Sequence, residues 1–262
     1  MKKYMVSLVI CVADDLRIKN MLDSIKEFCE VVVVINGGTQ KVKDIVNSYK
    51  NSKKFDLKTI EIGERNLSKS RNIGMINATY DKVIFYDSDC VMKRGAIKKY
   101  DEMLDKYLLV DGYVKFSDDN FQSKIVSVLR SMGIPGYALC PSIGIHKDII
   151  KIIGYYFDEE IKWIEDSELN KRCKDKNIEV GIIRSVTCVH DNLSFKQDLR
   201  SAYRYGTGVK TAARKGLHEK RPTANWNLIL PCFRENILSG FYCIIWNIVY
   251  CLGYYFSRRK LW

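Results

Sequence analysis

The sequence lacks the cysteine spacings of zinc sites and disulfide frameworks. Its nine cysteines are an odd number, and no two of them are separated by two residues. Several lie in apolar stretches, where cysteine acts as a small hydrophobic residue. We therefore expect free thiols and a reducing, cytoplasmic compartment.

The sequence also lacks a signal-peptide cleavage pattern, low-complexity linkers and internal repeats. The first apolar stretch ends at Asp14 and Asp15, so a buried strand explains it better than an export signal does. The chain has 262 residues, of which 47% are hydrophobic and 28% charged. This composition is typical of one folded α/β domain, with or without a short appendage.

Positive charge is in excess, with 43 lysines and arginines against 31 acidic residues and a net charge of +12. Such a balance favours an anionic partner: nucleic acid, a phosphate-bearing small molecule or an acidic lipid surface. A solvated surface without a partner is the alternative. Nucleic-acid binding would need aromatic residues between the charges, and Tyr203 and Tyr205 supply few of them. We expect phosphate and membrane partners and no nucleic acid.

Apolar runs alternate with helical patterns in the first third of the chain. Buried strands are expected at 6–12, 31–35, 57–62 and 82–86, and helices at 15–29, 40–50 and 68–79. This order predicts a parallel sheet covered on both faces, which binds ligands at the carboxyl ends of its strands. The second half is less regular, with expected helices at 120–132, 148–153, 163–174 and 195–214, a strand at 180–189 and a loop at 133–136.

Asp87-Ser88-Asp89 follows the fourth expected strand. Two neighbouring carboxylates repel each other and are costly to desolvate unless a cation accompanies them. Mg²⁺ and Mn²⁺ prefer carboxylate and phosphate oxygens, and the small Ser88 lets a ligand approach closely. The motif predicts a metal-bound diphosphate. An ordinary acidic turn is the alternative.

Glu165 and Asp166, followed by Glu168, lie near the start of an expected helix. The helix dipole favours acidic residues there, which alone would explain them. The functional interpretation makes one carboxylate a general base that deprotonates an acceptor hydroxyl, with Trp163 lining the acceptor pocket.

Other candidate binding residues are single side chains elsewhere in the chain. His190 ends an apolar strand and is a candidate metal ligand, although a half-buried structural histidine fits equally. Arg71 has the fork of donors that holds a base or phosphate, or it lies on a solvated helix face. Arg200 and Arg204, in the basic stretch 196–215, would hold a leaving diphosphate or face an acidic membrane.

The C-terminal part contains a run of uncharged residues at 237–256. As a helix, this run would extend ~30 Å, about the thickness of a hydrocarbon core. Arginines and a lysine flank it, and its tyrosines and tryptophan suit the membrane interface. We expect residues 219–262 to associate with a membrane. A spanning anchor, an in-plane helix, a hairpin and a helix packed on the domain or in a dimer stay open.

The order of these motifs is more specific than any one of them. V-V-V-V-I-N-G-G-T, N-L-S-K-S-R-N-I-G, V-I-F-Y-D-S-D, W-I-E-D-S-E-L and V-H follow one another along the chain. Over about residues 5 to 215, the sequence resembles the family 2 glycosyltransferases of the GT-A fold. The resemblance implies an α/β fold, with a mostly parallel sheet flanked by helices, in a catalytic domain of residues 1–218.

The resemblance also implies a role for each matching residue. Asp14 and Asn36 would line the nucleobase pocket with Arg71 nearby, Asp87 would contact the ribose or metal, and Asp89 and His190 would hold Mn²⁺ or Mg²⁺. Asp166 would be the catalytic base, and Glu165 would orient either Asp166 or the acceptor. Val12, Ser88, Arg200 and Arg204 complete the expected donor-binding set.

Two departures from the family pattern affect specificity. Ile35-Asn36-Gly37-Gly38 stands where the family usually has D-D-G-S, so the choice of nucleobase is open. Gln197-x-x-Arg200 is followed by Ser201 where processive synthases have tryptophan, which favours a single transfer.

The expected activity is inverting transfer of a sugar from a nucleotide-diphosphate sugar to a hydroxyl. The acceptor would be a saccharide, glycolipid or lipid-linked molecule of surface glycan synthesis, at the cytoplasmic face of a membrane. A sugar-phosphate nucleotidyltransferase and a non-catalytic membrane-surface binding protein of the same fold are the alternatives.

Overall fold

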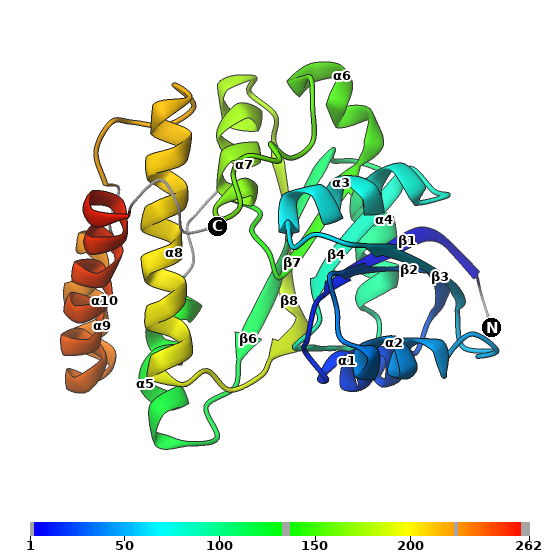
Figure 1. The fold of residues 1–262 in the computed structure, drawn as a ribbon, viewed down its shortest axis with the longest axis horizontal. Helices are drawn as coiled ribbons and strands as arrows, with labels where there is room; N and C mark the ends of the chain where they lie inside the picture. Colours follow the sequence, from blue (N-terminus) through cyan, green and yellow to red (C-terminus); the bar gives the residue numbers. More distant parts are fainter. Residues whose placement is uncertain (1–2, 133–136, 223–224, 258–262) are drawn as a thin grey trace. The chain divides into compact units, whose positions relative to one another are not determined.

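The structure is a computed structural model that describes residues 3–132, 137–222 and 225–257. The loop expected at 133–136 and the basic residues 258–260 lie outside them. The chain divides into two compact units (Figure 1). The first contains Met1–Lys115, Gly136–Glu159 and Leu169–His190, and the second contains Phe116–Pro135, Glu160–Glu168 and Asp191–Trp262.

An eight-stranded mixed sheet forms the first unit, in the order β3-β2-β1-β4-β7-β6-β8-β5. The first four strands in this order are parallel, whereas β7 is antiparallel to both β4 and β6, and β5 is antiparallel to β8. The strands are β1 (Lys3–Val12), β2 (Phe28–Asn36), β3 (Asp56–Ile62), β4 (Lys82–Asp87), β5 (Cys90–Met92), β6 (Leu109–Phe116), β7 (Ser142–His146) and β8 (Val180–His190).

Helices cover both faces of this sheet, because its central strands are apolar on both sides. In β1, Leu8 and Ile10 belong to one core and Val9 to the other. The first core contains α1 (Ile18–Ser24), α2 (Gln40–Asn47) and α4 (Ala96–Leu104); the second contains α3 (Leu67–Asn77), α6 (Ile150–Ile153) and the second half of α7 (Glu165–Asp175). A short 3-10 helix, η1 (Lys147–Ile149), precedes α6. Figure 1 shows α1 and α2 on the opposite side of the sheet from α3.

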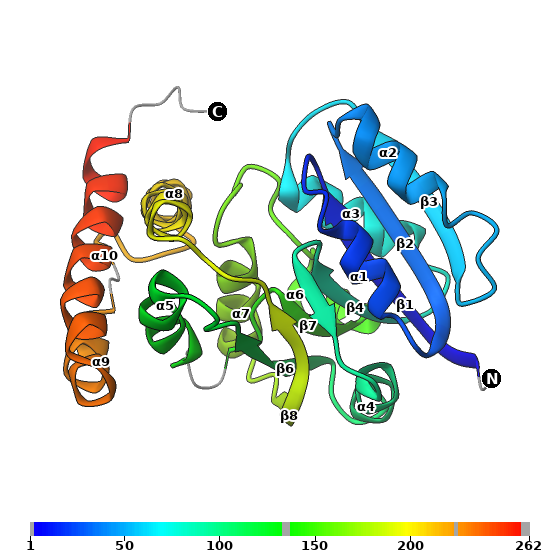
Figure 2. The ribbon, with the colours of Figure 1, turned by 90° about the horizontal axis from the view of Figure 1, so that it is seen from below.

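The second unit is a group of helices with its own apolar core (Figure 2). Helices α5, α8 and α10 match the expected ranges, whereas α9 and η2 were not expected. The helices are α5 (Phe121–Ser131), α8 (Phe195–Arg214), η2 (Trp226–Leu228), α9 (Ile229–Glu235) and α10 (Ile237–Phe256).

The first expected helix is much shorter than its predicted range. We predicted residues 15–29, and α1 contains only Ile18–Ser24. Asp15 does not join the helix because its carboxylate accepts hydrogen bonds from the backbone and side chain of Arg17. At the other end, Phe28 and Cys29 already belong to β2.

Candidate functional site

The strand ends bring the expected donor-site residues to one edge of the sheet. Strands β1, β2 and β4 are parallel neighbours, with Cys11 opposite Asp87 and Val12 opposite Ile35. Asp14, Asn36 and Asp87 therefore follow or end adjacent strands at the same edge. The side chain of Val12 is buried in the first core, so only its main chain can face a ligand.

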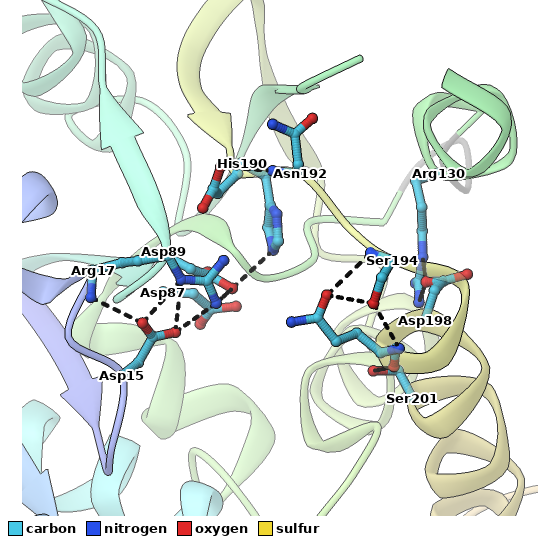
Figure 3. Close-up of polar contacts among 12 residues, drawn as sticks. Asp15, Arg17, Asp87, Asp89, Arg130, His190, Asn192, Ser194, Asp198 and Ser201 are labelled. Carbon is cyan, nitrogen blue, oxygen red and sulfur yellow. Dashed lines mark hydrogen bonds and ion pairs between the residues drawn. The ribbon is translucent and has the colours of Figure 1, made fainter. Parts of the chain in front are cut away.

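Asp89 lies between two cationic or potentially cationic side chains. Its Oδ2 is 3.2 Å from Nη2 of Arg17 and 3.4 Å from Nε2 of His190 (Figure 3). His190 reaches this position because the short β5 pairs with β8, which sets Cys90 opposite His190. Three segments distant in sequence thus meet at one carboxylate, which brings together Asp89 and His190, two of the residues expected to bind the metal.

The other oxygen of Asp89, Oδ1, is in a different environment. Oδ1 is buried and has no hydrogen bond within the described residues. A buried carboxylate oxygen without a partner is energetically costly and is commonly satisfied by an ion or water. The burial of Asp89 Oδ1 without a hydrogen bond among the described residues is the strongest evidence for a cation at the sheet edge.

Arg17 is a member of the site that the sequence analysis missed. Its Nη2 is 2.6 Å from Oδ2 of Asp15, and the same nitrogen contacts Asp89. Loss of water acts to raise the pKa of Asp15, but the hydrogen bonds from Arg17 outweigh it and lower that pKa. The spacing Asp15-x-Arg17 directly after the first strand was the available signal.

Arg71 holds Asp87 from inside the protein. Its side chain is 3% exposed, and Nη2 is 3.3 Å from Oδ1 of Asp87. Loss of surrounding water raises the pKa of Asp87, with Asp89 adding to the effect and Arg71 opposing it. The solvated helix face considered for Arg71 is therefore wrong. Arg71 orients Asp87, and a direct contact with a donor stays a prediction.

Asn36 has a fixed orientation. Its Oδ1 accepts a hydrogen bond of 2.8 Å from the backbone N–H of Asn66, which also caps α3. Since the backbone group can only donate, the amide oxygen of Asn36 faces Asn66 and its NH₂ is turned away from it. Nearby on the same edge, Asp14 pairs with Arg65.

The residues at this edge of the sheet can bind a divalent cation only if a ligand supplies the remaining oxygen atoms. Among residues 3–132, 137–222 and 225–257, no group of three or more histidine, cysteine or acidic side chains is arranged to hold a metal. Nucleotide-dependent enzymes commonly hold Mg²⁺ with one or two carboxylates plus substrate phosphates. Asp89 supplies such a carboxylate. The joint ligation by Asp87, Asp89 and His190 stays a prediction.

Glu165 and Asp166 begin α7 and belong to the second unit. Directly before them, Ile164 has a φ of 69°, which is strained for a β-branched residue. Gly208 of α8 makes room for this turn, since a Cβ there would lie 2.2 Å from the carbonyl oxygen of Trp163. Retained backbone strain is concentrated at functional sites, and the role of Asp166 as the catalytic base stays a prediction.

The arginines expected to bind the donor also lie in the second unit, on α8. Arg200 is exposed, and the guanidinium of Arg204 lies 4.6 Å from the centre of the Trp163 ring. Gln197, part of the expected Q-x-x-R element, accepts hydrogen bonds from the backbone and hydroxyl of Ser194. This is a helix cap, so the structure gives Gln197 a local folding role.

The sequence of the chain matches a known protein family. The family model described as glycosyl transferase family 2 matches residues 7–147, more than half of the chain. A comparison with curated proteins found no match.

Solved structures share the fold. Staphylococcus aureus TarS 1–349 in complex with UDP is 18% identical with a TM-score of 0.60, and the match covers 95% of this chain and 90% of that one. The mannosyltransferase PcManGT from Pyrobaculum calidifontis, in complex with GDP-Man and Mn²⁺, is 15% identical with a TM-score of 0.66, covering 97% and 74%. From the family match over more than half of its length, the chain belongs to glycosyl transferase family 2.

Proposed function

We propose that the protein is an inverting glycosyltransferase that moves one sugar from a nucleotide-diphosphate donor to a hydroxyl group. The acceptor is a saccharide, glycolipid or lipid-linked molecule of surface glycan synthesis. The observation that carries the proposal is the Asp89 carboxylate at the sheet edge of a family 2 chain. One of its oxygens is buried and has no hydrogen-bond partner in the part of the chain that the structure describes.

The roles of the chain's own residues follow from their chemistry. Asp166 takes the proton from the acceptor hydroxyl as its oxygen bonds to the anomeric carbon, while the bond to the diphosphate breaks and the nucleoside diphosphate leaves with the electron pair. Asp89, with Asp87 and His190 beside it, would hold Mn²⁺ or Mg²⁺. When bound, the cation offsets the charge of the leaving diphosphate. Asn36 and Asp14 contact the nucleobase, and Arg200 and Arg204 hold phosphate.

Residues 1–218 form the catalytic part in this proposal, and residues 219–262 attach it to the cytoplasmic face of a membrane. One described helix, Ile237–Phe256, is long and apolar enough to cross a bilayer, and 44% of its most apolar window is buried within the protein. A lipid-linked acceptor explains why a nucleotide-sugar enzyme carries such a segment.

A panel of nucleotide sugars, tested by thermal unfolding with Mn²⁺, will identify the donor. A donor that binds the folded state is expected to raise the melting temperature, and nucleoside diphosphate release should follow when an acceptor is added. UDP-GlcNAc and GDP-Man are the first candidates. Diphosphate release from a nucleoside triphosphate and a sugar phosphate would instead identify a nucleotidyltransferase, and no binding or turnover with any donor would leave a non-catalytic protein.

Removing the arginine beside Asp89 is expected to tighten Mn²⁺ binding to the donor-free protein. The guanidinium of Arg17 competes for the carboxylate that the cation needs. Two unit charges ~4 Å apart interact by about 4 kcal/mol at an effective dielectric of 20. We expect about a third of this energy to be gained for Mn²⁺ binding in R17Q, which lowers the Kd for Mn²⁺ roughly tenfold. Isothermal titration with Mn²⁺ measures it.

Lys19→Gln is the matched control for Arg17→Gln. Lys19 lies in the first turn of α1, two residues after Arg17, and pairs with Asp23, so K19Q removes the same charge without touching Asp89. If both variants bind Mn²⁺ as the unmodified protein does, Arg17 does not compete with the cation.

A further inference from the structure

Helix α10 has two faces of different character. The side chains of one face are exposed and apolar along the whole helix: Ile237, Phe241, Ile245, Ile248, Leu252 and Tyr255. At 1.5 Å per residue this face is ~30 Å long. We call these six residues the apolar face of α10. A continuous apolar surface of this kind marks an interaction site.

The opposite face of α10 is fixed to α8 by close backbone contact. A Cβ at Gly206 of α8 would lie 2.0 Å from the carbonyl oxygen of Tyr250, and a Cβ at Gly253 would lie 2.0 Å from that of Tyr203. The two helices therefore cross where each contributes a glycine. They lie side by side in both ribbon views (Figures 1 and 2).

A buried polar network strengthens this attachment. Asp198 of α8 is fully buried and accepts hydrogen bonds from Nε of Arg130 on α5 and from the hydroxyl of Tyr242 on α10, both at 2.6 Å. Figure 3 shows the Arg130–Asp198 pair. Crossing a bilayer would require α10 to leave Asp198 and to carry the buried Asn247 into lipid, both of which are costly.

The chain that precedes α10 carries mostly positive charge, which is complementary to an acidic lipid surface. Two of its basic residues lie at the ends of the helix: Arg234 comes three residues before it, and Lys210 donates hydrogen bonds to the carbonyl oxygens of Tyr255 and Ser257. Between residues 210 and 260, Glu219 and Glu235 are the only acidic residues in the sequence. The described basic residues of this region are Lys210, Arg214, Lys215, Lys220, Arg221 and Arg234. Basic residues beside an apolar helix face are typical of helices that bind anionic membranes, whereas a second copy of the chain would bring like charges together.

We propose that α10 docks on an anionic membrane in the plane of the surface, through its apolar face, while it stays packed on α8. This deepens the membrane association in the proposed function and rests on it. Helices of this type insert their apolar side ~5–10 Å into the boundary between headgroups and acyl chains. The helix is thus attached to one leaflet and does not span.

Co-sedimentation of the full chain with vesicles tests the docking. The unmodified protein is expected to bind vesicles of phosphatidylglycerol and phosphatidylcholine more strongly than vesicles of phosphatidylcholine alone. Replacing Ile245, Ile248 and Leu252 together with glutamine should weaken binding by at least about tenfold, because it removes apolar area that the lipid would cover. The matched control replaces three exposed isoleucines of the first unit, Ile76, Ile152 and Ile182, with glutamine and should bind as before.

The results that would overturn membrane docking differ from those that would overturn the proposed enzymatic function. Equal binding of the unmodified protein and the triple variant would overturn docking by this face. So would a dimer in sedimentation velocity that the triple variant dissociates, with no vesicle binding. Nucleoside diphosphate release by the same samples reports on the enzyme, and it should persist in the triple variant with a soluble acceptor.

The depth of α10 distinguishes an in-plane from a spanning helix. Single tryptophans introduced by Ile245→Trp and Tyr255→Trp should be quenched equally by lipids brominated at one acyl-chain depth, after subtraction of the native signal. In a spanning helix, position 245 lies near the bilayer centre and position 255 near the interface. Unequal quenching that places position 245 deeper in the bilayer than position 255 would overturn the in-plane orientation.

Discussion

Asp166→Asn is expected to reduce sugar transfer by about a thousandfold, with donor affinity nearly unchanged. An amide cannot accept the proton of the acceptor hydroxyl, and positioned general bases commonly contribute 10²- to 10⁴-fold. Asparagine keeps the size of the side chain and its acceptor oxygen, so the hydrogen bond from the backbone of Ser167 can persist. Transfer is measured as acceptor-dependent nucleoside diphosphate release, and donor binding by titration calorimetry.

Asp175→Asn at the other end of α7 provides the comparison for this substitution. Asp175 is exposed and pairs with Lys171. The substitution D175N therefore makes the same chemical change on the same helix, at a position remote from the turn at Ile164. Full activity in D166N would show that another group is the base. Loss of activity in both variants would point to damage of the helix.

Asp89→Asn should abolish the part of donor binding that depends on the divalent cation. The substitution removes the charge of the carboxylate and gives the cation a weaker ligand. We expect the donor Kd in Mn²⁺ to rise about a hundredfold, equivalent to ~2.7 kcal/mol, to the value of the unmodified protein in EDTA. Calorimetry with and without Mn²⁺ separates the two contributions.

Asp105→Asn is the control for this second prediction. Asp105 is exposed and pairs with Lys82, away from the edge that carries Asp89. D105N should bind the donor normally. Undiminished Mn²⁺-dependent binding in D89N would remove the metal assignment.

Local patterns predicted the strands in the first third of the chain and the positions of their ends. The apolar runs of β1, β2 and β4 are long enough to be recognised alone, and Asp14, Asn36 and Asp87 follow directly from where these strands end. The helical periodicities of α5 and α8 and the uncharged run of α10 also identified their elements.

The elements that were missed depend on pairing between distant segments. Strand β7 is only five residues long, and β6 contains Asp111 and Gly112, so neither has a strong local pattern. They become strands because β7 pairs with β4 and β6, which are distant in sequence. For the same reason, the contact between Arg17 and Asp89, 72 positions apart, has no signal in sequence spacing.

The paired glycines of α8 and α10 have a consequence for Arg200 and Arg204, the arginines proposed to bind phosphate, if the enzyme docks on lipid. Main-chain atoms set the distance between these two helices at Gly206 and Gly253, so rotamer changes cannot vary it. A helix anchored in one leaflet would then keep Arg200 and Arg204 at a constant height above the headgroups. The bilayer itself would serve as the reference plane from which a lipid-carried sugar acceptor is presented.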